Sequence, residues 1–97
     1  MHKKMNPKVR LIIEETFPKL IERHIRTRPA VEATQKSLDS YRKMGYAAVR
    51  NLSPEERDLN EKALDTAYAA SMQQLHDFHA REKSHSGTME GTEKETI

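Results

Sequence analysis

Residues 52–78 read LSPEERDLNEKALDTAYAASMQQLHDF, and this stretch decides the fold because it predicts one long helix. It opens with a capping box, in which Ser53 caps free backbone amides, Pro54 takes the first helical position and Glu56 follows three residues after the cap. After Pro54 the sequence contains no further proline, and its next glycine is Gly87. The sequence therefore predicts a helix over residues 54–83.

Two lines of side chains run along this predicted helix with steps of three and four residues, the spacing of one helix face. The first line consists of Leu59, Ala63, Ala67 and Ala70. The second line consists of Leu64, Tyr68, Ser71, Leu75, Phe78 and Glu82. The alanines are small, so the first line predicts that another helix can approach closely.

The first part of the chain predicts a kinked helix over residues 7–27. Asn6-Pro7 is a helix start, because asparagine caps free amides and proline is favoured at the first helical position. An apolar stripe follows, and Pro18 interrupts it. This proline either kinks one helix or begins a second helix capped by Thr16. We favour the kink, because the stripe stays in phase across the proline.

A further helix is expected over residues 29–44, with Thr27 as its cap. Its apolar seam is narrow, of the kind found between packed helices. The seam consists of Val31, Thr34, Leu38, Tyr41 and Met44. Gly45 suits the left-handed residue that ends many helices, and residues 46–51 either extend the helix or form one extra turn.

The C-terminal residues 84–97 are polar, contain two of the three glycines and show no periodicity, so we expect a flexible tail. No alternating pattern bounded by hairpin turns predicts a strand. The expected fold class is all-α, with three main helices in one domain over residues 1–83, the first of them kinked at Pro18. They form either a small helical bundle or an αα-hairpin-based dimer.

The hydrophobic core is expected to be thin. Val, Ile, Leu and Phe account for 17 of the 97 residues, while the net charge is only +2. So low an apolar fraction is found in many disordered chains, but disorder usually requires high net charge as well. Chains with little core often gain stability by self-association or by binding a partner. We therefore expect a larger protein, a second copy of the chain, or both as partners.

The sequence also predicts the compartment. It lacks cysteine, which excludes disulfides, thiolate metal sites and thiol catalysis and fits a reducing compartment. No stretch approaches the ~20 apolar residues of a membrane span, and no signal peptide is recognisable at the N-terminus. We expect a cytoplasmic protein with no membrane contact.

Charge is divided unevenly along the chain. Residues 1–50 carry twelve Lys and Arg against five acids, whereas residues 51–97 carry five against ten. This asymmetry indicates either helices of opposite charge that pair within the fold or a basic surface for nucleic acid. The candidate nucleic-acid-binding residues are Lys19, Arg23, Arg26, Arg28, Lys36 and Arg42.

Pairing within the fold is the favoured interpretation. Arg23, Arg26 and Arg28 lie at the end of a predicted helix, where cations complement the negative end of the dipole. The bend that follows lacks glycine, and the next helix exposes Glu32 and Asp39, which would repel phosphate. No aromatic residues are interleaved with the basic ones, so stacking on single strands is also poorly supported.

No pattern predicts catalysis or a cofactor. His76 and His79 share a helix face, and Glu82 continues their spacing. A tight metal site needs further ligands from another element, for which His24 is the obvious candidate. We favour partly solvated histidines at the edge of the core and predict no metal site. The serines lack a nucleophile elbow and no phosphate loop is present, so we expect no enzyme, no cofactor and no small-molecule substrate.

The remaining candidates indicate protein–protein contact, because Tyr and Met are adaptable contact residues and Tyr is enriched at the energetic centres of interfaces. The candidate partner-binding residues are Tyr41, Met44, Tyr46 and Tyr68, although core filling is the commoner role of such residues. The leading hypothesis is a non-enzymatic helical adaptor, inhibitor or regulatory subunit that docks on another protein, as a monomer or as a homodimer. The alternative is a small basic-faced accessory protein that binds nucleic acid.

Overall fold

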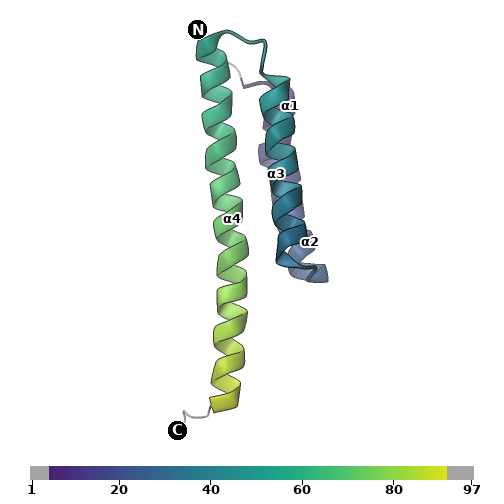
Figure 1. The fold of residues 1–97 in the computed structure, drawn as a ribbon, viewed down its shortest axis with the longest axis vertical. Coiled ribbons are helices and arrows are strands. Elements are labelled where there is room, and N and C mark those ends of the chain that lie inside the picture. The colour runs from purple at the N-terminus through teal and green to yellow at the C-terminus, as the bar shows by residue number, and fades with distance from the viewer. Residues whose placement is uncertain (1–4, 92–97) are drawn as a thin grey trace.

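The computed structural model describes the backbone of residues 5–91 and the side chains of residues 5–82, and the regular elements of this part are all helices (Figure 1). The elements are α1 (Pro7–Leu11), η1 (Ile12–Thr16), α2 (Phe17–Thr27), α3 (Val31–Ala48) and α4 (Pro54–Gly91). The first three follow one another without a break and form one kinked helix. The predicted all-α fold with three main helices, the first of them kinked, is therefore confirmed.

The kink in the first helix arises from a wider turn directly before a proline. Pro18 has no backbone N–H, and its ring crowds the carbonyl of Glu14 in the preceding turn. The element η1 is a π-helix that covers this turn, and its wider spacing relieves the crowding. Thr16 has helical dihedral angles and forms no side-chain capping bond. The alternative of a second helix capped by Thr16 is therefore wrong.

Helix α2 ends where it was expected, but without the predicted cap for the next helix. Arg28 takes the left-handed conformation (φ 53°, ψ 54°), and its N–H donates to the carbonyl of His24 at 2.8 Å. The hydroxyl of Thr27 donates to the carbonyl of Arg23 within α2. The predicted capping of α3 by Thr27 is therefore wrong, because this hydroxyl is already bonded to its own helix.

Helix α3 begins and ends later than predicted. Ala30 is extended (φ −59°, ψ 139°), so the helix starts at Val31 instead of residue 29. It then continues through Gly45 to Ala48, so residues 46–48 extend the helix and residues 49–51 form a turn. Met44, which was expected in the apolar seam, is 47% exposed.

Gly45 lies inside α3 because the helix approaches α4 very closely at this point. A Cβ atom on Gly45 would lie 2.6 Å from Cδ1 of Leu64, which is completely buried. A larger residue at this position would therefore require the buried Leu64 side chain or the helix itself to shift. The prediction that Gly45 ends the helix in a left-handed conformation is wrong, since no glycine in the described chain has a positive φ.

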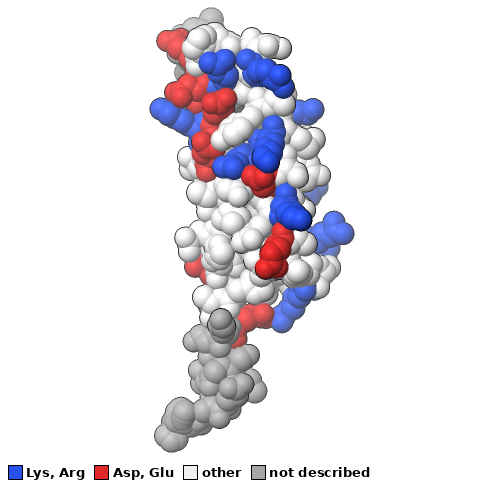
Figure 2. Space-filling model, viewed as in Figure 1, with Lys and Arg blue, Asp and Glu red and all other residues white. Residues whose placement is uncertain are grey.

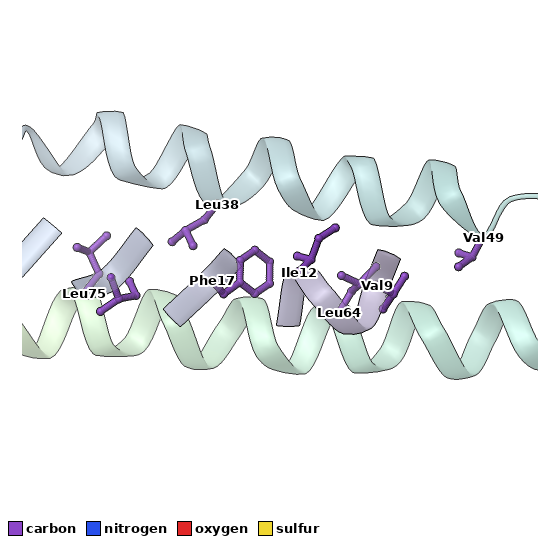
Figure 3. Packing of buried hydrophobic residues seen from close by; sticks show 8 residues of the cluster. Val9, Ile12, Phe17, Leu38, Val49, Leu64 and Leu75 are labelled. Atoms are coloured by element: carbon purple, nitrogen blue, oxygen red, sulfur yellow. The ribbon is translucent and has the colours of Figure 1, made fainter. Parts of the chain in front are cut away.

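Helix α4 supplies the surface against which the other helices pack (Figure 3). The buried hydrophobic side chains are Val9, Ile12, Phe17, Ile21, Leu38, Val49, Leu64 and Leu75. Full burial of such a side chain contributes about 1.5–3 kcal/mol. Leu64 and Leu75 belong to the second line of side chains on α4, so that line faces the core.

The start of α1 is fixed to α4 by a buried amide. The Asn6 side chain accepts hydrogen bonds from the N–H groups of Lys8 and Val9, at 2.8 and 3.3 Å, and so caps α1 as predicted. The backbone N–H of Asn6 donates to Oδ1 of Asn60 at 2.8 Å, and Nδ2 of Asn60 donates to the carbonyl of Glu56 at 2.7 Å. Asn60 is completely buried, and these bonds satisfy both ends of its amide.

The predicted capping residues stand at the start of α4. The N–H of Glu56 donates to Oγ of Ser53, and this hydroxyl donates to the Glu56 carboxylate, both at 3.3 Å. The helix continues to Gly91, beyond the predicted end near residue 83, because no proline stops it and an interior glycine costs only ~1 kcal/mol. The predicted tail therefore begins as helix, and residues 92–97 lie outside the described residues. No helix in the described part of the chain is long and apolar enough to cross a membrane.

Replacement of Gly45 by alanine should destabilise the protein by about 1–2 kcal/mol, because overpacking against Leu64 outweighs the gain in helix propensity. Chemical denaturation measures the change in the free energy of unfolding. In the Leu64→Ala background the space is open, so Gly45→Ala should there be neutral or stabilising. Equal effects in both backgrounds would show that the close approach of α3 to α4 does not require glycine.

Candidate functional site

The line of small residues on α4 remains partly uncovered by the rest of the fold. A hollow of about 460 Å³ runs beside it and is lined by Met5, Ile13, Leu59, Lys62, Ala63, Thr66, Ala67 and Ala70. Leu59 is 38% exposed, Ala70 is exposed, and Ala63 and Ala67 are half-buried. We call the hollow with these eight residues the α4 groove. Its walls are almost entirely apolar, because Lys62 and Thr66 supply the only polar side chains of its lining.

A second hollow adjoins the α4 groove on the side of α1. It measures about 660 Å³ and is lined by Met5, Pro7, Arg10, Leu11, Glu14 and Glu15. Met5 belongs to both hollows, and Leu11 is 52% exposed. The apolar surface therefore continues from α4 across Met5 onto α1.

The charged side chains around the two hollows are paired along their own helices. The pairs are Arg10–Glu14, Lys19–Glu15 and Lys62–Asp58, with distances of 3.4, 3.8 and 3.3 Å. Exposed pairs of this kind contribute little to stability, but they cancel each other's charge. A ligand of this surface would therefore be selected by apolar contact and not by a strong charge.

The four predicted partner-binding residues occupy different environments. Tyr41, Tyr46 and Tyr68 are half-buried and pack against the hydrophobic core, whereas Met44 is 47% exposed. Tyr46 and Tyr68 both lie beside the guanidinium of Arg42. These two tyrosines therefore take part in holding α3 to α4, and their role in partner binding stays a prediction.

Arg42 connects α3 to α4 through aromatic and charged contacts. Its guanidinium carbon lies 4.1 Å from the ring centroid of Tyr68 and 5.8 Å from that of Tyr46. One terminal nitrogen donates to Asp39 at 3.0 Å, and the other lies 3.9 Å from Asp65. Arg42 is therefore engaged within the fold, which favours the interpretation that the basic and acidic parts of the chain pair with each other.

The protonation states of this cluster are fixed by its hydrogen bonds. The hydrogen bond from Lys43, supported by Arg42, lowers the pKa of Asp39 although partial desolvation opposes the shift. The Tyr46 hydroxyl donates to Asp65, and this bond together with burial raises the pKa of Tyr46. Asp39 is thus ionised and Tyr46 neutral near pH 7, so the cluster is a structural connection without a titrating acid–base pair.

The six candidate nucleic-acid-binding residues are divided by the fold. Three of them are paired with carboxylates, as Lys19–Glu15, Arg28–Glu82 and Arg42–Asp39. Arg42 also lies near Asp65, and this pair and Arg28–Glu82 join the basic half of the chain to the acidic half. Arg23, Arg26 and Lys36 are exposed, and their side chains form no ion pair within residues 5–82. On the face shown in Figure 2, Lys and Arg stand beside Asp and Glu over much of the upper half. Half of the candidate set is therefore free to contact phosphate.

Two histidines that are far apart in the sequence face each other where α2 meets α4. Nε2 of His24 lies 2.8 Å from Nε2 of His79, and Nδ1 of His24 lies 2.7 Å from Oγ1 of Thr34. His24 is only 1% exposed, and burial, followed by the neighbouring His79, lowers its pKa while Glu82 opposes the shift. His76 is exposed. Among the described side chains, no group of three or more His, Asp or Glu is placed to hold a metal ion.

Sequence reasoning missed parts of this arrangement for definite reasons. Met5 precedes the first helix and carries no periodic signal, so its place in both hollows could not be predicted. The contact between Arg42 and Tyr68 joins two helices and has no local signature. The contact of His24 with α4 did have a signal, because His24 ends the apolar stripe of the first helix and faces the core there.

No protein-family model matches the chain, and neither a curated protein nor a solved structure shows a significant match. The function must therefore be inferred from the geometry of the chain itself.

Replacement of Arg42 by glutamine should destabilise the protein by about 1–2 kcal/mol, because the cation over the Tyr68 ring and the half-buried bond to Asp39 are both lost. Lys43→Gln is the matched control. Lys43 also pairs with Asp39 but its side chain is 72% exposed, so no measurable loss is expected. Thermal and urea denaturation of both variants measure the difference, and equal stabilities would contradict a role of Arg42 in joining α3 to α4.

Proposed function

We propose that this protein is a non-enzymatic adaptor, inhibitor or regulatory subunit that binds an amphipathic helix of a larger protein in the α4 groove. The observation that carries the proposal is the exposure of an apolar strip on α4 beside Met5 and Ile13. The fold buries one of the two lines of side chains on α4 and leaves the other partly open. A partner that covers the open line would supply the apolar contact that the thin core lacks.

The shape of the α4 groove suits a helix. From Leu59 to Ala70 the groove follows α4 for about 16 Å, at ~1.5 Å per residue, which corresponds to about three turns of a partner helix. Alanine and threonine side chains along the floor allow two helix axes to approach to about 8 Å. Leu59 at one end of the strip is large and exposed, and it provides a contact that fixes the partner's position.

The chemistry of the groove supports an apolar partner face. The nearby charges are already paired along their own helices, so a partner need not bring a particular net charge. Grooves of this kind bind helices through side chains spaced by three and four residues. The partner helix should accordingly present Leu, Ile or Met along one face and polar residues along the other.

Ala70→Arg should abolish partner capture, because Ala70 is exposed in the groove and a guanidinium there would block an apolar helix. Ala69→Arg is the matched control, since Ala69 is also exposed but does not line the groove. Affinity capture from extracts of the native host, read by quantitative mass spectrometry, compares both variants with the wild type. A partner retained by Ala69→Arg and lost by Ala70→Arg is expected.

The same pair of variants separates a foreign partner from a second copy of the chain. Sedimentation of the purified protein would detect a dimer if one forms. The melting temperature of such a dimer would depend on protein concentration. If Ala70→Arg dissociates such a dimer, the groove binds a second copy of the chain, and the proposal that it binds a larger protein is wrong. Capture that is equal for the two arginine variants would reject the groove as the docking surface.

Nucleic-acid binding is the second candidate, and it rests on the exposed cations Arg23, Arg26 and Lys36. Arg23 and Arg26 are three residues apart on α2 and therefore lie on adjacent turns. The other three members of the predicted set are paired with carboxylates, as Lys19–Glu15, Arg28–Glu82 and Arg42–Asp39. This distribution favours protein docking over phosphate binding.

Titration of a fluorescent DNA duplex should show at most weak binding, and the slope of log affinity against log salt should be about −3 if Arg23, Arg26 and Lys36 alone contact phosphate. Arg23→Glu combined with Arg26→Glu should remove this residual binding. A markedly steeper slope would show that cations other than these three also contact phosphate, and nucleic-acid binding would then become the favoured function.

A further inference from the structure

The end of the fold at the α2–α3 bend is held to α4 by a set of polar contacts. His24 near the end of α2 contacts His79 on α4, and Arg28 in the bend pairs with Glu82 at 2.5 Å. The guanidinium of Arg28 also lies 5.7 Å from the ring centroid of Phe78. We call the contacts of His24, Arg28, His79 and Glu82 the bend latch.

The histidine contact in the bend latch requires the two facing nitrogens to share one proton. At 2.8 Å, one Nε2 must carry a hydrogen and the other a lone pair. The hydroxyl of Thr34 can donate to or accept from Nδ1 of His24, so it accommodates either tautomer. The closed pair can therefore take up one additional proton, but a second would place two N–H groups against each other.

The surroundings of His24 do not compensate a second positive charge. On α4, His79 opposes it and Glu82 favours it, but Glu82 is already paired with Arg28 from the bend. On α2, Arg23 lines the same small hollow as His24, and α3 contributes only uncharged side chains to that hollow, among them Thr34. Among the described residues, Glu82 is thus the carboxylate that could balance the positive charge of the histidine pair. It is already shared with Arg28, which is always charged.

We propose that the bend latch is a pH-sensitive device: below about pH 6.5, protonation of both His24 and His79 increasingly favours the opening of the α2–α3 bend from α4 while the rest of the fold stays packed. The closed latch holds at most one added proton, whereas the open latch holds two. Each pH unit below the ordinary range of histidine therefore favours the open latch by a further factor of about ten.

The sign of the effect follows from the burial of His24. Burial lowers the pKa of His24 in the closed state, so its contribution to stability is complete above the ordinary value of 6.5 and is lost as the pH falls below it. The exposed ends of the bend make local opening easier than global unfolding, since Ile25 is 45% exposed and Pro29 and Ala30 are exposed.

The other end of the described fold lacks this sensitivity. The Asn6–Asn60 bond, the cap at Ser53 and the contact of Gly45 with Leu64 involve no titrating group of the histidine range. An acid-induced change should therefore be confined to the bend and to the part of α4 that faces it.

Amide hydrogen exchange of the full chain, followed by NMR and corrected for intrinsic rates, tests the proposal. Between pH 7.5 and pH 5.5 the opening constants of amides around the bend, residues 24–36, should rise about tenfold, while those around Asn60 stay constant. His24→Gln should abolish the rise, because glutamine can still hydrogen-bond but does not titrate. His76→Gln, which removes an exposed histidine from the same helix, should leave the rise intact.

Direct titration of the histidine side chains in the wild type gives a readout that does not depend on any variant. His24 and His79 should bind their second proton together with the opening of the bend. A tenfold rise that persists in His24→Gln, a rise of equal size at every amide, or titration of His24 and His79 independently of each other and of the opening would each overturn the proposal.

Discussion

The close contact of α3 with α4 at Gly45 and Leu64 is the constraint on which the remaining arrangement depends. Because Gly45 has no side chain, the Leu64 side chain fits directly against α3 there, so α3 lies against α4 along much of its length and the kinked first helix fits beside both (Figure 1). Two neighbouring helices cannot surround α4 completely. The side of α4 that carries Ala63, Ala67 and Ala70 is consequently left partly open, and the α4 groove is a direct result of how the core is built.

The kink contributes to the same groove. In the π-helical turn before Pro18, Ile12 is buried in the core whereas Ile13, the next residue, lines the groove. Neighbouring side chains on a helix point about 100° apart, so the two isoleucines can serve two surfaces, the interior and the open side of α4. The turn that accommodates the proline therefore also supplies an apolar wall, and Met5, held near α4 by the bond from Asn6 to Asn60, supplies another.

Sequence reasoning succeeded where the signal is local and failed where tertiary contact decides. The caps at Asn6 and Ser53, the kink at Pro18 and the division of α4 into two lines all follow from short-range chemistry. The prediction that Gly45 ends a helix was wrong because a glycine late in a helix usually indicates its C-terminal end. Only the position of α4 shows that Gly45 is needed for close packing. The interactions of Thr27 and the place of Met5 in the groove depend likewise on the fold, so no pattern within one segment could specify them. The contact of His24 with His79 had a partial signal, because His24 ends the apolar stripe of the first helix and faces the core.

The α4 groove and the bend latch lie on the same helix but are separated along it. The groove ends at Ala70, and His79 stands nine residues further on, about 13 Å at ~1.5 Å per residue. A ligand shifts a conformational equilibrium only if it binds the two states differently. A partner helix confined to the groove contacts the same side chains whether the latch is open or closed, so its affinity should not depend on the latch. A longer partner helix that reaches Phe78 would compete with the bend for α4 and would bind more tightly in acid. The pH dependence of partner affinity therefore reports how far along α4 the partner extends.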